Sequence, residues 1–357
     1  MKRLANFFAP QPEETDEEFI TNKINDISKG VNIQDSVRAM VSLASQFSEL
    51  IGVKATPYLI QILKDYSQDD TTIGCTLQIL TDIVSEPNTN DNQKNNIGNN
   101  FGNNNNLLKS SSNSDYIVNT DHSISNILQC LKSTKPSVRN QALTLLSRLI
   151  NYQLIGVQKE FLEDNYSQTF LFNLAHDASE AIQTQFFYFV PKFVQGNPDI
   201  QQLFVFNILD TISQNMKEKY KLYIPVIYSL LYNNNDTQKM FVEMNHLNDL
   251  VPAIQSSDEQ AIDFLIMLFS TSNNASKYRH FILGSELFQI VVTQARANTE
   301  KRSKFIRLLG WLIRGDSDLC ALMTEATPTT NNANSNTPNS NLTATTTTLE
   351  IILRTAI

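Results

Sequence analysis

The chain has 357 residues, of which 41% are hydrophobic, so it can bury a substantial core. It contains only 10 glycines and 11 prolines, and this scarcity of turn residues argues against an all-β fold and favours an all-α fold. Its 36 acidic and 28 basic residues give a net charge of −8, which excludes the basic surface that nucleic-acid binding requires.

Residues 1–15 are expected to form a flexible N-terminus. Lys2 and Arg3, with Phe7 and Phe8, are its only membrane-like cluster, and two charges with two aromatic rings are too few for stable anchoring. The segment lacks the apolar core of a signal peptide, and no apolar run in the chain reaches the roughly 18 residues of a membrane span. The three cysteines (Cys75, Cys130 and Cys320) lie far apart, which indicates a reducing compartment. We therefore expect a cytoplasmic protein.

The first helical region covers residues 16–87. Its apolar residues recur with the period of a helix that buries one face. The segments QDSVRAMVSLASQF and DDTTIGCTLQILTDIVSEPN each predict a long helix, and the stretch 58–66 predicts a shorter helix between them. The apolar positions of the two long helices are Val37, Met40, Val41 and Ala44, then Ile73, Leu77, Leu80 and Val84.

Residues 88–120 are dominated by Asn and Ser. A segment this polar cannot offset the entropy of ordering by burying apolar surface, so we expect a disordered insert. A second polar segment, 327–348, is rich in Thr and Asn and predicts a disordered linker before residues 349–357, which resemble the start of a further helix. Both segments are interpreted as expansions of surface connections.

The second helical region covers residues 121–326 and contains one repeated pattern. In the segment 135–151, which begins KPSVRNQ, Pro136 suits the first turn of a helix. The apolar positions of this segment recur in four later segments, here given one after another: Val138, Ala142, Leu145, Leu146 and Leu149; Ile182, Phe186, Phe189, Val190 and Phe193; Tyr223, Val226, Ile227 and Leu230; Ala261, Phe264, Leu265 and Leu268; Phe305, Leu308, Leu309 and Leu312.

The spacing of these segments indicates the type of repeat. From Leu149 onward the equivalent position recurs after steps of 37 to 44 residues, which is the armadillo or HEAT period. Shorter apolar helices precede the long ones, at 126–133, 169–176, 246–255 and 286–295. Pro191 and Pro225 fall inside two long helices, where each is expected to cause a kink. The predicted fold is an all-α, armadillo/HEAT-like α-solenoid superhelix with two disordered low-complexity loops.

No motif for catalysis, a cofactor or a metal stands out. The sequence lacks GxxxxGK[ST], GxGxxG, GxSxG and HExxH, and its four histidines (His122, His176, His246 and His280) are too far apart to share a helix turn. Glu259 and Asp263 form an i, i+4 carboxylate pair, which is interpreted as a solvated helix face. Trp311 is interpreted as core or inter-repeat packing. We expect a protein that is not an enzyme and has no catalytic, cofactor-binding or metal-binding residue.

The order of these segments resembles a known family. Residues 35–88, with a V-R-A-x-x-S-L helix start and the later I-G-x-x-L-x-x-L-x-x-I-V-S-E, are similar to the first repeats of the globular head of the general vesicular transport factor family, which are long coiled-coil vesicle tethers of the Golgi. The segments NILQCLKSTKPSVRNQALTLLSRLI and NNNDTQKMFVEMNHLNDLVP resemble the same head. The resemblance implies a vesicle-tethering head in ER-to-Golgi and intra-Golgi transport.

The resemblance also implies partners and location. Members of the family associate with Rab-family GTPases, SNARE proteins and golgins, so we expect peripheral attachment to Golgi membranes through proteins. The chain ends at Ile357 without a heptad region, and a homodimer is expected only if a coiled-coil tail follows. The alternative is a generic cytosolic armadillo-repeat scaffold or adaptor. Peptide-binding armadillo grooves carry a ladder of Asn on their third helices, whereas here only Asn140 lies on a long helix, which favours the tether.

Overall fold

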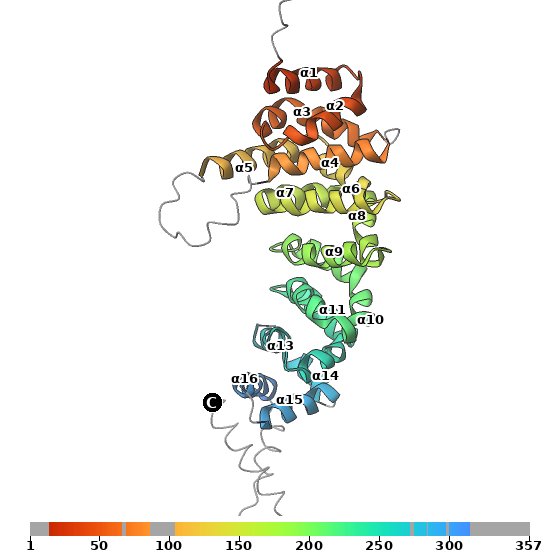
Figure 1. Cartoon of the computed structure of the whole chain (residues 1–357). Helices are drawn as coiled ribbons and strands as arrows, with labels where there is room; N and C mark the ends of the chain where they lie inside the picture. Colours follow the sequence, from red (N-terminus) through yellow and green to blue (C-terminus); the bar gives the residue numbers. More distant parts are fainter. Residues whose placement is uncertain are drawn as a thin grey trace, which may run out of the picture. The chain divides into compact units, whose positions relative to one another are not determined.

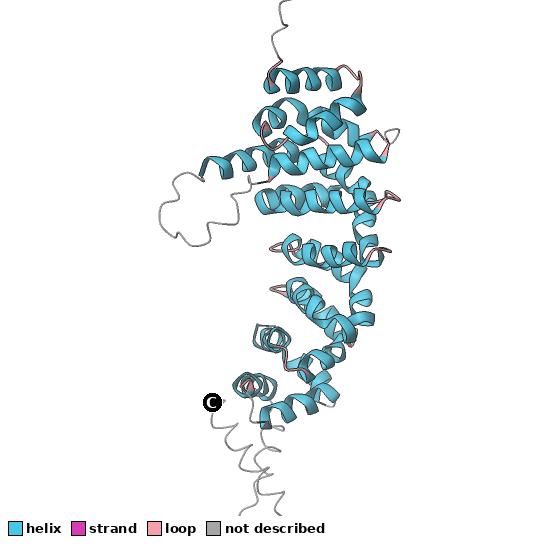
Figure 2. Cartoon of the chain, viewed as in Figure 1, coloured by secondary structure: helices cyan, strands magenta, loops and turns pink. Residues whose placement is uncertain are grey.

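The computed structural model describes residues 14–65, 69–85, 104–271, 275–283, 285–297 and 300–314. Within these ranges the chain consists of helices and their connections, with no strand (Figure 2). The predictions for residues 1–13, 88–103, 327–348 and 349–357 lie outside the described residues. The chain divides into two compact units, Met1–Phe189 and Val190–Ile357, which are described in turn.

Unit 1 is a stack of helices in which each long helix packs on its neighbours; α4, for example, contacts α3, α5 and α7 (Figure 1). Its elements are α1 (Asp16–Ser28), α2 (Ile33–Met40), η2 (Val41–Leu43), α3 (Ser48–Lys64), α4 (Asp70–Val84), α5 (Asn104–Val118), α6 (Ser123–Cys130), α7 (Pro136–Glu163), α8 (Asn165–Phe172), η4 (Asn173–His176) and most of α9 (Glu180–Phe193).

Local side chains determine where the first helices begin. Thr15 accepts a hydrogen bond from the backbone N–H of Glu18, and the Glu18 carboxylate accepts one from the N–H of Thr15, which closes a capping box at the start of α1. Asp69 accepts from the N–H of Thr72 at 2.8 Å and caps α4 in the same way. These caps occupy N–H groups that the first turn of a helix leaves without partners.

The predicted apolar stripe of α7 is buried as expected. Leu145 and Leu149 are fully buried, and no member of the stripe is more than 2% exposed. Pro136 occupies the first turn, as predicted. The helix was predicted to end at residue 151, but α7 extends to Glu163. A break at Gln153, where φ is −131° and ψ is 44°, divides it into two helical segments. Burial of the stripe therefore positions the first segment of α7 in the stack.

The prediction of a disordered insert over 88–120 is wrong for its second part, because residues 104–118 form α5. The Asn113 side chain is 2% exposed and donates to the carbonyl oxygens of Ser48 at 3.1 Å and Ile83 at 2.8 Å. Ile117 is fully buried. The polar composition was misleading because the Asn113 side chain donates to two backbone carbonyls, one at the start of α3 and one at the end of α4.

The short helix predicted at 58–66 is the second half of a longer helix, α3, which runs through Gly52 and Pro57. A Cβ atom at Gly52 would lie 2.0 Å from Oδ1 of Asn113, so glycine is required where α5 crosses α3. Gly52 therefore allows α3 and α5 to pack closely.

Unit 2 contains the remainder of α9 and a second series of helices. All predicted repeat positions in this series are buried, with none more than 2% exposed: Tyr223, Val226, Ile227 and Leu230; Ala261, Phe264, Leu265 and Leu268; Phe305, Leu308, Leu309 and Leu312. The elements are α10 (Pro198–Leu231), α11 (Asn235–Glu243), η5 (His246–Leu250), α12 (Val251–Gln255), α13 (Glu259–Thr271), α14 (Ala275–Leu283), α15 (Glu286–Arg296) and α16 (Arg302–Ile313).

The break in α10 does not fall at Pro225, where the kink was predicted. It lies at Lys219, where φ is −123° and ψ is 28°, and helical dihedral angles continue through Pro225. An Asn-rich turn follows α10. Asn233 adopts a positive φ of 55°, and the side chain of Asn234 accepts from the N–H groups of Asp236 and Thr237 to start α11.

Hydrogen bonds between successive repeats reproduce the period seen in the sequence. In seven of these bonds the partners are separated by 36 to 41 residues. In unit 1 the pairs are Ile124 and Glu160, Arg139 and Asp177, and Thr144 and Gln185; in unit 2 they are Pro198 and Asn234, Ser213 and Asp249, Ser257 and Gln294, and Asp263 and Lys304.

Candidate interaction surface

The most enclosed histidine is a structural link in unit 2. His246 is 8% exposed, and its Nδ1 lies 2.7 Å from Oδ2 of Asp249. The hydroxyl of Ser213 donates to the same carboxylate oxygen at 2.6 Å. Because the serine hydroxyl points to the aspartate and not to the imidazole, the group lacks the serine–histidine contact of a hydrolase triad. It ties η5 to α10.

One hollow in unit 1 has a volume of about 540 Å³ and is lined by Lys64, His122, Ser125, Asn126, Gln129, Glu160, Glu163 and Asp164. Glu160 accepts from the N–H of Ile124 at 2.9 Å, at the start of α6. Burial raises the pKa of Glu160, and the backbone N–H groups of Ser125 and Ile124 oppose this effect. Asp164 caps α8 through the N–H of Ser167. These two carboxylates are therefore occupied as helix caps.

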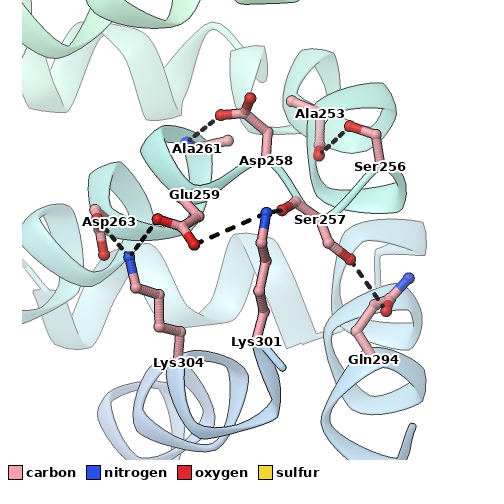
Figure 3. A network of polar contacts seen from close by, with 10 residues as sticks. All are labelled: Ala253, Ser256, Ser257, Asp258, Glu259, Ala261, Asp263, Gln294, Lys301 and Lys304. Carbon is pink, nitrogen blue, oxygen red and sulfur yellow. Dashed lines mark hydrogen bonds and ion pairs between the residues drawn. The ribbon is translucent and has the colours of Figure 1, made fainter. Parts of the chain in front are cut away.

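The carboxylate pair singled out in the sequence is bound by lysines of the next repeat (Figure 3). Nζ of Lys304 lies 3.0 Å from Oδ2 of Asp263 and 3.4 Å from Oε2 of Glu259. Nζ of Lys301 donates to the carbonyl of Ser257 at 2.8 Å and lies 3.9 Å from Glu259. The hydrogen bond to Asp263 is the main cause that raises the pKa of Lys304. Both carboxylates act as partners for these cations between α13 and α16.

Tyr228 on α10 and Tyr232, the residue that follows α10, form a pair of rings in the same unit. The rings of Tyr228 and Tyr232 stack with centroids 5.6 Å apart and an interplanar angle of 22°. Tyr228 also packs edge-on against Phe264 of α13, with centroids 6.5 Å apart. Burial raises the pKa of Tyr228, and the nearby Tyr232 and Asp263 raise it further. We call Tyr228, Tyr232, Glu259 and Asp263 the tyrosine–carboxylate patch.

Trp311, the single tryptophan of the chain, lies on α16 of unit 2. Trp311 is half-buried on α16, between the buried Leu308 and Leu312. The guanidinium of Arg314 lies 4.8 Å from its ring centroid. This placement agrees with the predicted packing role, and the arginine covers part of the ring.

Unit 1 carries an equivalent but uncharged connection. Nε2 of Gln185 on α9 donates to Oγ1 of Thr144 on α7 at 2.9 Å. These partners are 41 residues apart, the same separation as Lys304 and Asp263 in unit 2. Asn140, the one candidate for an asparagine ladder, is exposed, so the polar connection here is made by glutamine and threonine.

Cys130 and the acidic groups of the described residues offer no further site. Burial raises the pKa of Cys130 to about 12, so its thiol stays protonated near neutral pH. Across the described ranges, no three His, Cys, Asp or Glu side chains are grouped so that they could hold a metal ion. In the same ranges we find no helix with the length and apolar character needed to span a bilayer.

No protein-family model matches the sequence. The chain is similar to the general vesicular transport factor p115 of Bos taurus and of Homo sapiens, with 23% identity over 262 residues in each case. Each alignment covers 70% of this chain and 27% of the relative, so the chain spans about a quarter of the length of the curated relatives it matches. The resemblance to the general vesicular transport factor family is confirmed.

Solved structures confirm the fold class. Two crystal structures of Uso1 superpose with TM-scores of 0.74 and 0.77 at 15% identity. They cover 87% and 98% of this chain, and the chain covers 54% and 62% of them. A computationally designed armadillo repeat protein for modular peptide recognition has a TM-score of 0.52 at 16% identity. The alignment covers 71% of this chain and 100% of the designed chain. The fold is an all-α, armadillo-like repeat fold.

Sequence reasoning assigned no site residue, and it missed the tyrosine–carboxylate patch. It recognised Glu259 and Asp263 as a pair on one helix face, but it did not connect them with Tyr228 or Lys304. The repeat alignment does not supply this contact, because it sets Asp263 against Arg307, whereas Lys304 lies about one turn earlier on α16.

Proposed function

We propose that this chain forms part of the head of a vesicle-tethering factor in ER-to-Golgi and intra-Golgi transport. The observation that carries the proposal is the similarity to p115, which extends over 70% of the chain. That relative is a general vesicular transport factor, and its name describes no catalytic activity. On this proposal the chain contributes binding surfaces to a longer tether and performs no reaction.

The proposed partners are a Rab-type GTPase, SNARE proteins and golgins, bound through the outer faces of the helical repeats on Golgi membranes. The structural support is that both units present folded polar faces across successive helices, such as the pairs Thr144 with Gln185 and Asp263 with Lys304. Repeat folds commonly bind partners along such extended faces.

Recruitment is proposed to depend on membrane proteins and not on lipid. The net charge of −8 opposes attraction to an anionic leaflet. Each basic residue near such a surface contributes only about 1 kcal/mol, so a polybasic segment is needed for lipid binding. A chain with excess acidic residues is therefore expected to need a protein receptor.

A flotation experiment tests this proposal. The purified chain is mixed with Golgi membranes that carry GTP-loaded Rab proteins, with the same membranes carrying GDP-loaded Rab proteins, and with protein-free anionic liposomes. We expect flotation with the first membranes only. The chain is also displayed on a multivalent streptavidin support, because clustering restores the avidity that a longer oligomeric tether would have.

Flotation with bare anionic liposomes would contradict recruitment by proteins. If the clustered chain floats with none of the three membranes, the tether proposal is wrong. Binding of extended peptides under those conditions would then favour the alternative, an armadillo-type adaptor, which is the use named for the designed repeat protein of similar fold.

A further inference from the structure

Helix α16 carries an excess of positive charge. From its N-cap to its C-cap it has no acidic residue, and its basic residues are Lys301, Arg302, Lys304, Arg307 and Arg314. Lys304 binds Asp263 and Glu259 of α13, and Lys301 lies 3.9 Å from Glu259 (Figure 3). Two of these cations therefore already bind carboxylate groups within the fold.

Two of the arginines flank the tryptophan of α16. Arg307 and Arg314 are exposed, and among the described residues neither has a carboxylate within ion-pair distance. Trp311 is half-buried, and the spacing of the three positions places their side chains on one side of the helix. The guanidinium of Arg314 lies 4.8 Å from the ring centroid of Trp311. We call Arg307, Trp311 and Arg314 the arginine–tryptophan face.

The spacing of the two arginines determines which carboxylates they can bind together. Arg307 and Arg314 are two helical turns apart, which is about 10 Å along the axis. Two acidic residues three positions apart in an extended chain are also about 10 Å apart. Each guanidinium can donate paired hydrogen bonds to one carboxylate. An apolar side chain between the two acids then meets the exposed part of the Trp311 ring.

Larger anionic surfaces fit this face less well than a short acidic segment. A bilayer or a nucleic acid brings many negative charges close to the whole chain, and the net charge of −8 repels them. A short segment brings its charges only to the two arginines, which have no counter-charge among the described residues.

We propose that the arginine–tryptophan face is a docking site for an extended acidic segment of another protein, with two carboxylate residues three positions apart. Arg307 binds one carboxylate, Arg314 binds the other, and an apolar residue between them packs on Trp311. This inference goes beyond the tethering proposal and does not rest on it. Its test contains no membrane and no GTPase, so the failure of one proposal is distinguishable from the failure of the other.

The test follows the fluorescence of Trp311 in the full chain, because this residue is the single tryptophan. The probe is the peptide acetyl-Gly-Glu-Leu-Ser-Glu-Gly-amide. One control peptide has glutamine in place of both glutamates. A second control, acetyl-Gly-Leu-Glu-Glu-Ser-Gly-amide, has the same composition with adjacent carboxylates. We expect a saturable change in emission with the probe, at an affinity about fivefold higher than for the glutamine peptide, as exposed ion pairs imply.

Variants of exposed side chains locate the binding site without disturbing the core. Arg307→Gln and Arg314→Gln are each expected to weaken binding of the probe about two- to fivefold, the range of one exposed ion pair. The double variant is expected to bind the probe and the glutamine peptide equally. Arg148→Gln on α7 is the matched control, because Arg148 is also an exposed arginine but lies in unit 1, and it should leave the affinity unchanged.

The chain contains acidic residues that could compete for the same face, since Asp316 and Asp318 follow α16 in the sequence. The titration is therefore repeated on a double variant, Asp316→Asn with Asp318→Asn. Binding by the parent chain supports the proposal. Binding by the double variant alone would show that these two aspartates occupy the face, and it would rule out the site for another protein.

Three further results would overturn the proposal. The first is an equal affinity of the parent chain for the probe and the glutamine peptide. The second is an equal affinity for the peptide with adjacent carboxylates, which would contradict the spacing of the two arginines. The third is an equal response of Trp311 to inorganic phosphate at the same concentration of charge, which would indicate unspecific anion binding.

Discussion

Leu146 and Arg148 lie two residues apart on α7 in opposite environments. Leu146 is 1% exposed within the apolar stripe, whereas Arg148 is exposed. Burial raises the pKa of Asp82, and the hydrogen bond from Gln78 and the positive charge of Arg148 partly oppose this rise. The two positions therefore allow a comparison between a core residue and a surface residue of the same helix.

We predict that Leu146→Asp lowers the free energy of unfolding by several kcal/mol, because it places an unpaired carboxylate in an apolar core. Arg148→Gln is the control and is expected to change stability by less than about 0.5 kcal/mol, as for most surface substitutions. Thermal melts of both variants measure the difference. Equal shifts in melting temperature would show that the stripe was misassigned.

Arg139 and Asp177 form the most enclosed ion pair of unit 1. Their side chains are 12% and 4% exposed, and the guanidinium donates two hydrogen bonds to the carboxylate, at 2.6 and 2.7 Å. Burial raises the pKa of Asp177, but the hydrogen bonds from Arg139 and the N–H of Ser179, with the charge of Arg139, leave it lowered overall. The pair joins α7 to the residues that precede α9.

We predict that Asp177→Asn destabilises the chain by about 3 kcal/mol at pH 7, because it leaves the arginine without its counter-charge. A lowered pKa in the folded state means that the stabilisation is present above the pKa of the unfolded chain, about 3.9, and is lost as pH falls through the folded value. Urea unfolding of the variant and of the parent chain should therefore differ equally at pH 7 and pH 5, and converge below about pH 4.

The control for this comparison is Asp121→Asn, since Asp121 is exposed in the turn before α6. It should leave stability unchanged across the same pH range. A difference between Asp177→Asn and the parent chain that grows as pH falls would contradict the assigned role of the carboxylate.

At the scale of elements, α5 shows how one polar side chain can hold a helix in place. Asn113 connects the start of α3 with the end of α4 through two carbonyl oxygens. Gly52 makes room for this side chain on α3. A second glycine, Gly156 on α7, lies beside Val118, where an added Cβ would approach within 2.7 Å. Helix α5 therefore meets α3 and α7 each at a glycine.

We predict that Asn113→Ala costs about 1–3 kcal/mol, since it leaves the buried carbonyl of Ile83 without its donor. Gly52→Ala is expected to destabilise the parent chain, because the new methyl group displaces Asn113. In the Asn113→Ala background the same change should cost less, with a coupling of about 1 kcal/mol. Chemical denaturation of the four proteins measures this cycle. Strictly additive effects would show that the two residues do not share the crossing.

At the scale of the whole molecule, the repeat appears in two independent ways. Apolar positions recur along the sequence at steps of 37 to 44 residues, and hydrogen bonds between neighbouring repeats join residues 36 to 41 apart. The first series is buried and the second crosses from one repeat to the next. Within each unit, neighbouring repeats therefore cover apolar surface that a single helix pair would leave exposed.

The sequence by itself determined the fold class, the repeat period and the apolar stripes of the long helices from residue 135 onward, because periodic burial is a local property of the chain. The long helix predicted over residues 34–47 was wrong, because α2 ends at Met40 and Val41 is only half-buried. Only the tertiary structure decided that residues 104–118 are helical and that the break in α10 lies at Lys219. It also decided that Glu259 and Asp263 meet Lys304. These outcomes depend on side chains distant in sequence, such as Asn113 reaching Ile83, and no local pattern records such a contact before the helices pack.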